Sequence, residues 1–192
     1  MKSDVSIFQI GFNKCGTCSL CDFFSKNNIF CRHWEQGLIS DEFYRSFESK
    51  EKPFTSRHFG NTVAITDSNK ITYDAIKEPY KEYKYLHRHY PNSYFILNTR
   101  DREKWIRSRL KHGNLCHRYQ VNLNLSKQEV IEYWRNEWDA HHRDVKEYFK
   151  DNMKFLVFDI ERDSIDILCQ FLSESFPNID KTLWRHHNKT RG

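Results

Sequence analysis

The chain has 192 residues, of which 38% are hydrophobic and 16% aromatic, so it is apolar enough to bury a core and is not intrinsically disordered. Its 31 Lys and Arg residues against 26 Asp and Glu residues give a net charge of +5, which suits an anionic ligand or an acidic glycan but does not by itself indicate nucleic-acid binding. No apolar run approaches the ~20 residues of a membrane-spanning helix. Residues 1–4 lead straight into a first strand and leave no room for a signal peptide. We therefore expect one cytoplasmic domain over residues 1–192, with no nucleic-acid partner and no membrane span.

Strand and helix patterns alternate along the chain. Short β-branched and aromatic runs predict strands at residues 5–10, 29–34, 62–66, 94–99 and 154–160. Helical spacing of apolar residues predicts helices at residues 17–24, 40–47, 73–90, 100–113, 126–150 and 163–176. This alternation predicts an α/β fold, in which helices flank a central parallel β-sheet on both faces.

The predicted helix at residues 126–150 carries two specific signals. Ser126 and Glu129 have the spacing of a capping box, which satisfies free N–H groups at the start of a helix. Trp134 and Trp138 stand four residues apart and so share one face, and we expect both in the core rather than stacked on a ligand.

A glycine-rich turn joins the first strand to the first helix. Gly11 and Gly16 allow a tight or left-handed backbone and close approach of an anion. The helix start offers unpaired N–H groups and a partial positive charge, to which Lys14 adds a full charge and Thr17 and Ser19 add hydroxyl donors. Strand, glycine turn and helix together predict a phosphate-binding loop.

The order of residues in this loop differs from the common nucleotide loop Gly-x4-Gly-Lys-Ser/Thr. Here Lys14 precedes the second glycine, Gly16, and that order resembles the 5′-phosphosulfate loop of the sulfotransferases that use 3′-phosphoadenosine 5′-phosphosulfate (PAPS). The family loop typically reads Pro-Lys-x-Gly-Thr-Thr/Ser. Asn13 stands where proline is common, and Cys18 where threonine or serine is common.

A second motif strengthens the resemblance. Arg100 directly follows the strand at residues 94–99, and Ser108 lies on the next helix, as in the family's Arg-x7-Ser site for the 3′-phosphate. A guanidinium also suits bidentate phosphate recognition on chemical grounds. Three further segments resemble the family's YPxAxFILxxRDP, LLVFD with Cys-x-Phe-Leu, and HxNKT phrases, at residues 90–101, 155–172 and 187–190.

The resemblance implies a P-loop NTPase-like sulfotransferase fold and a metal-independent reaction. A sulfuryl group would move in line from PAPS to a hydroxyl or amine of a glycan or small molecule, with Lys14 neutralising charge on the bridging oxygen. Arg100 and Ser108 would hold the 3′-phosphate. The residues expected to bind the cofactor are Asn13, Lys14, Cys15, Gly16, Thr17, Cys18, Ser19, Arg100, Ser108, Asn188 and Lys189.

Three residues are candidates for the base that removes the acceptor's proton. His33 and Glu35 follow the second strand and Asp67 follows the third, and the carboxyl ends of parallel strands face the ligand crevice. A histidine of ordinary pKa ~6.5 needs little tuning, whereas a carboxylate needs desolvation or a like-charged neighbour. We rank His33 before Glu35 and Glu35 before Asp67, although His33 could be a packed strand end and Asp67 could cap a turn.

Cys15, Cys18 and Cys21 have a spacing that invites a metal or redox site. On the helical interpretation, however, Cys18 and Cys21 point along the helix while Cys15 sits in the turn. We therefore favour small, reduced thiols that fill space beside a tight loop, and we expect no metal.

Two other functions use the same loop. A P-loop kinase of small molecules would need a lysine after the second glycine, which Cys15-Gly16-Thr17 does not supply. A non-catalytic nucleotide- or glycan-binding module would need no base. The sequence leaves the acceptor and the oligomeric state open, since Trp34, Phe43 and Tyr44 could stack on a sugar or on a phenol equally well.

Overall fold

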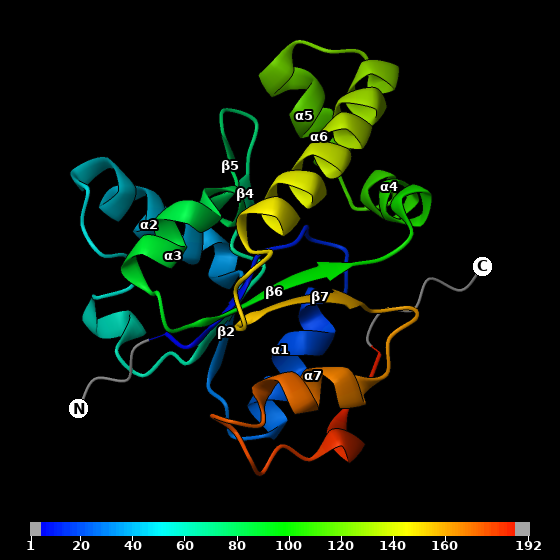
Figure 1. The fold of residues 1–192 in the computed structure, drawn as a ribbon. Coiled ribbons are helices and arrows are strands. Elements are labelled where there is room, and N and C mark those ends of the chain that lie inside the picture. The colour runs from blue at the N-terminus through cyan, green and yellow to red at the C-terminus, as the bar shows by residue number, and fades with distance from the viewer. Residues whose placement is uncertain (1–4, 187–192) are drawn as a thin grey trace.

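A five-stranded sheet forms the centre of the molecule in a computed structural model, which describes residues 5–186 (Figure 1). The strand order is β2-β3-β1-β6-β7, and every pairing within the sheet is parallel. The strands are β1 (Ile7–Gln9), β2 (Cys31–His33), β3 (Ala64–Thr66), β6 (Tyr94–Thr99) and β7 (Phe155–Asp159). The predicted α/β fold with a central parallel sheet is confirmed.

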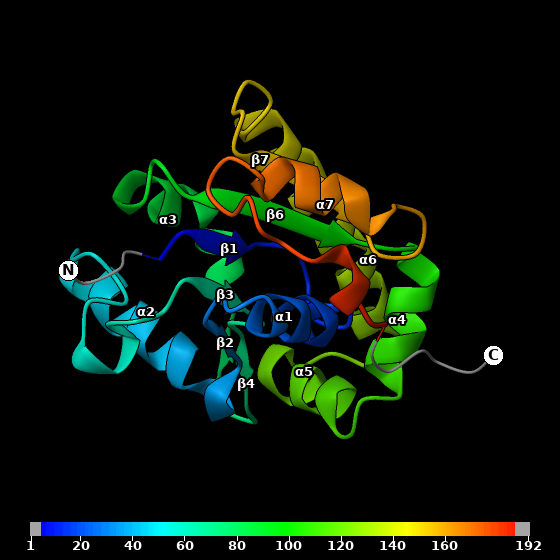
Figure 2. The same ribbon diagram turned by 90° about the horizontal axis from the view of Figure 1, so that it is seen from below.

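Helices cover both faces of the sheet, because neighbouring strand residues point to opposite sides. Ile7 belongs to the apolar cluster on one face and Phe8 to the cluster on the other, and each is at most 1% exposed. The face of Ile7 packs against α1 (Thr17–Lys26) and α7 (Ile165–Leu172). The face of Phe8 carries α2 (Leu38–Ser49), α3 (Tyr83–His89), α4 (Arg102–Leu110), α5 (Leu115–Leu123) and α6 (Lys127–Tyr148), as Figures 1 and 2 show.

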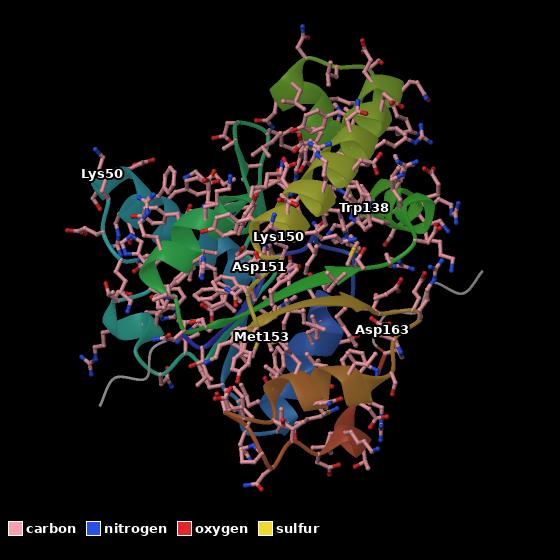
Figure 3. The ribbon with its side chains drawn as sticks, in the orientation of Figure 1. Lys50, Trp138, Lys150, Asp151, Met153 and Asp163 are labelled. Atoms are coloured by element: carbon pink, nitrogen blue, oxygen red, sulfur yellow. The ribbon has the colours of Figure 1, made fainter. Side chains whose placement is uncertain are left out.

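The long helix α6 follows its sequence signals. Ser126 accepts a hydrogen bond from the backbone N–H of Glu129, and the Glu129 side chain accepts one from the backbone of Ser126, so the capping box is confirmed. Trp134 and Trp138 are 1% and 6% exposed, which confirms their place in the core. Figure 3 marks Trp138 among the side chains between α6 and α4, where its ring centroid lies 4.6 Å from that of Trp105. None of the helices in the described part of the chain combines the length and apolar character needed to cross a membrane.

The single helix predicted over residues 73–90 is wrong. The structure has a two-stranded antiparallel hairpin there, formed by β4 (Lys70–Ile71) and β5 (Ile76–Lys77), then a 3-10 turn at Pro79–Glu82 and the short α3. Thr72 closes the hairpin, since its N–H donates to the carbonyl of Ala75 and its hydroxyl donates to Asp74. Pro79 has no N–H and starts the 3-10 turn instead of continuing a helix. The sequence analysis also missed α5, which begins two residues after the left-handed Gly113.

Candidate active site

A cavity of about 870 Å³ opens at the carboxyl edge of the parallel sheet, where ligands of open α/β folds bind. It is lined by residues that follow all five parallel strands. Those used below are Asn13, Lys14, Gly16, Thr17, Cys18, Ser19, His33, Trp34, Gln36, Asp67, Asn69, Lys70, Arg100, Lys104, Ser108, His112, Arg118 and Glu161.

The segment from Gly11 to Ser19, called here the glycine loop, is fixed from below by a side chain of β6. The Asn98 Oδ1 atom accepts from the Gly11 N–H at 3.1 Å and from the Gln9 side-chain amide at 2.6 Å, and its Nδ2 donates to the Cys15 carbonyl at 2.7 Å. Asn98 is fully buried. A Cβ atom on Gly11 would lie 2.2 Å from the Asn98 carbonyl oxygen, so only glycine fits at this crossing.

Two residues of the glycine loop have a left-handed backbone, Lys14 with φ 63° and Gly16 with φ 76°. Gly16 is the residue before α1, and the first helical hydrogen bond runs from the Leu20 N–H to the Gly16 carbonyl. The N–H groups of residues 17–19 therefore precede the helical ladder and lie beside the cavity. This geometry suits an anion, as the glycine pattern predicts.

Arg100 approaches the glycine loop from the end of β6. Its Nη1 donates to the Lys14 carbonyl at 3.2 Å, its Nη2 pairs with Glu161 at 2.7 Å, and its buried Nε has no hydrogen-bond partner among the residues that the structure describes. Ser108, on α4, lines the same cavity, and Lys104 reaches Glu161 at 3.2 Å. Burial raises the pKa of Glu161, but hydrogen bonds from Arg100 and Lys104 outweigh that effect and leave the pKa below its ordinary value. An ionised carboxylate thus holds both cations at the cavity wall.

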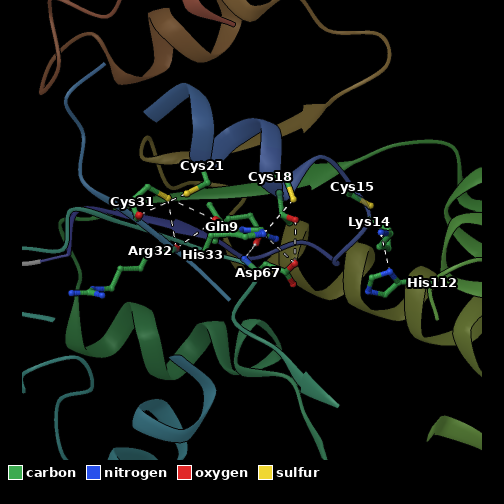
Figure 4. Close-up of polar contacts among 12 residues, drawn as sticks. Gln9, Lys14, Cys15, Cys18, Cys21, Cys31, Arg32, His33, Asp67 and His112 are labelled. Carbon is green, nitrogen blue, oxygen red and sulfur yellow. Dashed lines mark hydrogen bonds and ion pairs between the residues drawn. The ribbon is translucent and has the colours of Figure 1, made fainter. Parts of the chain in front are cut away.

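His33 and Asp67 meet on the opposite side of the cavity (Figure 4). The His33 Nε2 atom lies 3.7 Å from the Asp67 carboxylate and 3.3 Å from the Cys18 sulfur. Its Nδ1 contacts the Thr66 hydroxyl at 2.9 Å. Asp67 has a left-handed backbone with φ 50°, and its carboxylate accepts from the Thr17 hydroxyl at 3.4 Å.

Burial perturbs both members of this pair. It lowers the pKa of His33, an effect that the Asp67 charge opposes, and it raises the pKa of Asp67, an effect that His33 opposes. The Asp67 Oδ1 atom is buried and has no hydrogen-bond partner within the described part of the chain. A neutral imidazole with a carboxylate beside it is a suitable proton acceptor near neutral pH.

Glu35 does not reach the cavity in the described part of the chain. Its carboxylate accepts from Arg32 at 2.5 Å and pairs with His58 at 2.8 Å, on the far side of the backbone. Burial raises the pKa of Glu35, but the hydrogen bonds from His58 and Arg32 have the larger, opposite effect. The net pKa of Glu35 lies below its ordinary value. Among the described residues, His33 and Asp67 line the cavity and Glu35 does not, although all three were expected at the carboxyl ends of strands that face it.

The remaining expected residues differ in position. Asn13 and Cys18 line the cavity. The Cys15 side chain is fully buried, and burial raises the pKa of its thiol. Only the backbone of Cys15 is therefore left to contribute to the glycine loop. Cys21 turns toward the carbonyl of Cys31, so the three clustered cysteines diverge. Asn188 and Lys189 lie outside the described residues. Within the described residues, no group of three or more His, Cys, Asp or Glu side chains is arranged to bind a metal ion.

Sequence reasoning missed two polar residues that shape the site. Asn98 and Gln9 are buried in β6 and at the end of β1, and a polar residue inside an otherwise apolar strand was the signal that could have found them. His112 was also missed; its Nδ1 lies 3.4 Å from the Lys14 ammonium. Burial lowers the pKa of His112, as does the nearby positive charge of Lys14.

The fold and the cavity define an α/β protein with a glycine loop at the carboxyl edge of its parallel sheet. The model of the sulfotransferase domain family matches residues 6–128, so the chain belongs to that family. Its structure is similar to the crystal structure of a sulfotransferase from Alicyclobacillus acidocaldarius, with a TM-score of 0.54 and 16% identity over 94% of this chain and 85% of that one. That likeness confirms the fold. No curated protein matches the chain.

Proposed function

We propose that the protein transfers a sulfuryl group from PAPS to a hydroxyl or amine of a glycan or small molecule. The observation that carries the proposal is the composition of one cavity: Lys14, Arg100 and Ser108 lie along one part of its wall, and the His33–Asp67 pair lies along another. Groups that can bind an anion and a group that can accept a proton thus line the same cavity, as group transfer requires.

The donor part of the cavity fits a nucleotide with two phosphate-bearing ends. The N–H groups of residues 15–18, with the hydroxyls of Thr17 and Ser19, would hold the 5′-phosphosulfate. Arg100 and Ser108 would hold the 3′-phosphate. The Nε of Arg100, which has no hydrogen-bond partner among residues 5–186, could donate an additional hydrogen bond to it. When bound, PAPS supplies the sulfuryl group through its phosphosulfate linkage, and Lys14 would neutralise the charge that develops on the departing oxygen.

His33 is the base that the geometry favours. The Thr66 hydroxyl lies 2.9 Å from the His33 Nδ1 and 3.5 Å from the Arg32 carbonyl, and when it donates to that carbonyl its oxygen would accept from Nδ1–H of His33. This tautomer leaves the lone pair on Nε2, the atom next to Asp67 and Cys18. His33 would take the acceptor's proton on Nε2, and the Asp67 carboxylate would stabilise the imidazolium that forms.

Calorimetric titration with adenosine 3′,5′-bisphosphate tests the donor assignment, with ADP and 5′-AMP as controls and without metal. We expect tight binding that depends on the 3′-phosphate. A preference for ADP together with a requirement for Mg²⁺ would instead support a small-molecule kinase. Tight bisphosphate binding without transfer from radiolabelled PAPS to any acceptor tested would support a non-catalytic binding module.

A further inference from the structure

The backbone that follows β2 has a positive φ at four successive residues. Trp34, Glu35, Gln36 and Gly37 have φ values of 56°, 46°, 55° and 91°, all left-handed. This conformation strains the three residues other than glycine, so such a run persists only where its surroundings enforce it. The turn is closed by the Gly37 N–H, which donates to the Trp34 carbonyl at 2.9 Å.

A cluster of charged side chains next to this turn, Arg32, Glu35 and His58, holds its backbone in this conformation. Glu35 binds Arg32 at 2.5 Å and His58 at 2.8 Å. The Arg32 side chain is only 11% exposed; it also donates to the hydroxyl of Thr62 at 2.8 Å and to the His58 carbonyl, and its guanidinium lies 5.1 Å from the ring centroid of Phe59. In Figure 4 Arg32 extends away from the His33 and Asp67 side chains. Glu35 is thus fastened on the side of the turn opposite to the cavity.

The residues on either side of Glu35 line the cavity instead. Trp34 is 49% exposed although it is a large apolar residue, and Gln36 lies next to it in the cavity wall. The two other aromatic residues considered for acceptor stacking are not available, because Phe43 is fully buried and the Tyr44 hydroxyl accepts from the Glu78 N–H at 3.2 Å. Trp34 is therefore the aromatic surface that the structure offers to an acceptor.

The polar side chains that line the same cavity include amides and cations. Asn69 and Lys70 follow β3 into the cavity wall, and Arg118 joins them from α5. Lys70 is paired with Asp41 at 2.5 Å, while Arg118 donates one bond to the Ile71 carbonyl at 2.8 Å and has a buried Nε without a hydrogen-bond partner among residues 5–186. An indole face with amides that pair hydroxyl groups and a guanidinium that pairs a carboxylate suits a sugar acid better than a phenol.

We propose that Trp34 and Gln36 form the platform of an acceptor subsite for a carboxylate-bearing saccharide. Glu35 is the positioning residue of this platform: it acts through Arg32 and His58 and touches no substrate. This inference rests on the proposed sulfuryl transfer, whose acceptor it specifies.

The test uses a hyaluronan tetrasaccharide, which carries carboxylates, in the presence of saturating adenosine 3′,5′-bisphosphate. We expect Trp34→Ala to weaken calorimetric binding of the tetrasaccharide about tenfold or more, as the loss of one aromatic contact predicts, with bisphosphate binding unchanged. Tyr148→Ala is the matched control, because Tyr148 is 41% exposed and lies outside the cavity. Equal binding of neutral chitotetraose would overturn the carboxylate assignment. Binding of 4-nitrophenol that depends on Trp34, without binding of the tetrasaccharide, would overturn the saccharide assignment.

Glu35 variants separate positioning from catalysis with the same tetrasaccharide as acceptor. We expect Glu35→Ala to raise the acceptor KM about tenfold with a smaller change in kcat, and Glu35→Gln, which keeps an oxygen for Arg32, to restore most of the KM. A collapse of kcat at unchanged KM would make Glu35 the base and refute the positioning role. If the protein fails to bind the bisphosphate yet binds the tetrasaccharide through Trp34, sulfuryl transfer fails while the saccharide subsite stands. If the protein binds the bisphosphate but not the tetrasaccharide, the saccharide subsite fails while the proposed sulfuryl transfer stands.

Discussion

The hydrogen bonds of Asn98 lead to a prediction that can be worked out in magnitude. Asn98→Ala leaves the buried Gly11 N–H and the Cys15 carbonyl without the partners that now lie at 3.1 and 2.7 Å. A buried backbone group left unpaired costs about 1–3 kcal/mol, so the loss of both partners should lower the free energy of unfolding by about 2–6 kcal/mol. For a chain of this size that loss lowers the Tm by roughly 10 °C. The folded variant should also bind adenosine 3′,5′-bisphosphate more weakly, because the glycine loop loses its support.

Urea denaturation and calorimetric titration of the same samples measure both effects. Asn152→Ala is the matched control. The Asn152 side chain accepts from the Lys154 N–H at 2.8 Å just before β7, at the amino end of the parallel strands and away from the glycine loop. It should cost only about 1 kcal/mol and leave bisphosphate binding unchanged. If Asn98→Ala unfolds at the same urea concentration as the wild type and binds the bisphosphate equally well, the glycine loop is held by other contacts and the reasoning fails.

Three further predictions concern the cavity and the core. Lys14→Ala should lower kcat by about 100-fold or more but weaken the bisphosphate less than tenfold; equal losses would show that Lys14 only binds. Arg100→Ala should weaken adenosine 3′,5′-bisphosphate but not 5′-AMP, with Arg107→Ala at an exposed position of the following helix α4 as control, and equal weakening of both nucleotides would contradict the 3′-phosphate assignment. Burial lowers the pKa of His141 and of His142 to about 4. Since the unfolded chain protonates both near pH ~6.5, stability to urea should be greatest above that pH and fall as the pH drops toward 4; a gain in stability on acidification would contradict this.

The sequence carried the fold and much of the cavity because both follow from local patterns. Five apolar runs separated by helical segments leave few arrangements other than a parallel sheet. Once the strands are parallel, residues that follow them must meet at one edge, which is why His33 and Asp67 lie 3.7 Å apart and Arg100 reaches the glycine loop. The roles proposed for these residues stay predictions.

Other features depend on contacts between distant segments, which no local pattern records. Glu35, like His33, was expected to face the ligand crevice, but its direction is decided by Arg32 and His58, the second of them 23 residues further along the chain. The tyrosine-rich stretch after residue 72 has helical spacing, and a four-residue turn at residues 72–75, in which Thr72 donates to Asp74, overrides it. Neither outcome could be read from spacing alone.

The order of the strands has a consequence for how such a protein can change. The residues proposed to hold the 3′-phosphate follow β6, and the platform proposed for the acceptor follows β2, with β1 and its glycine loop between the two groups. The two proposed subsites thus lie on opposite halves of the sheet, on either side of the central loop. We expect substitutions on one half to alter the choice of acceptor while the other half keeps its nucleotide, so that a single scaffold can serve many acceptors with one donor.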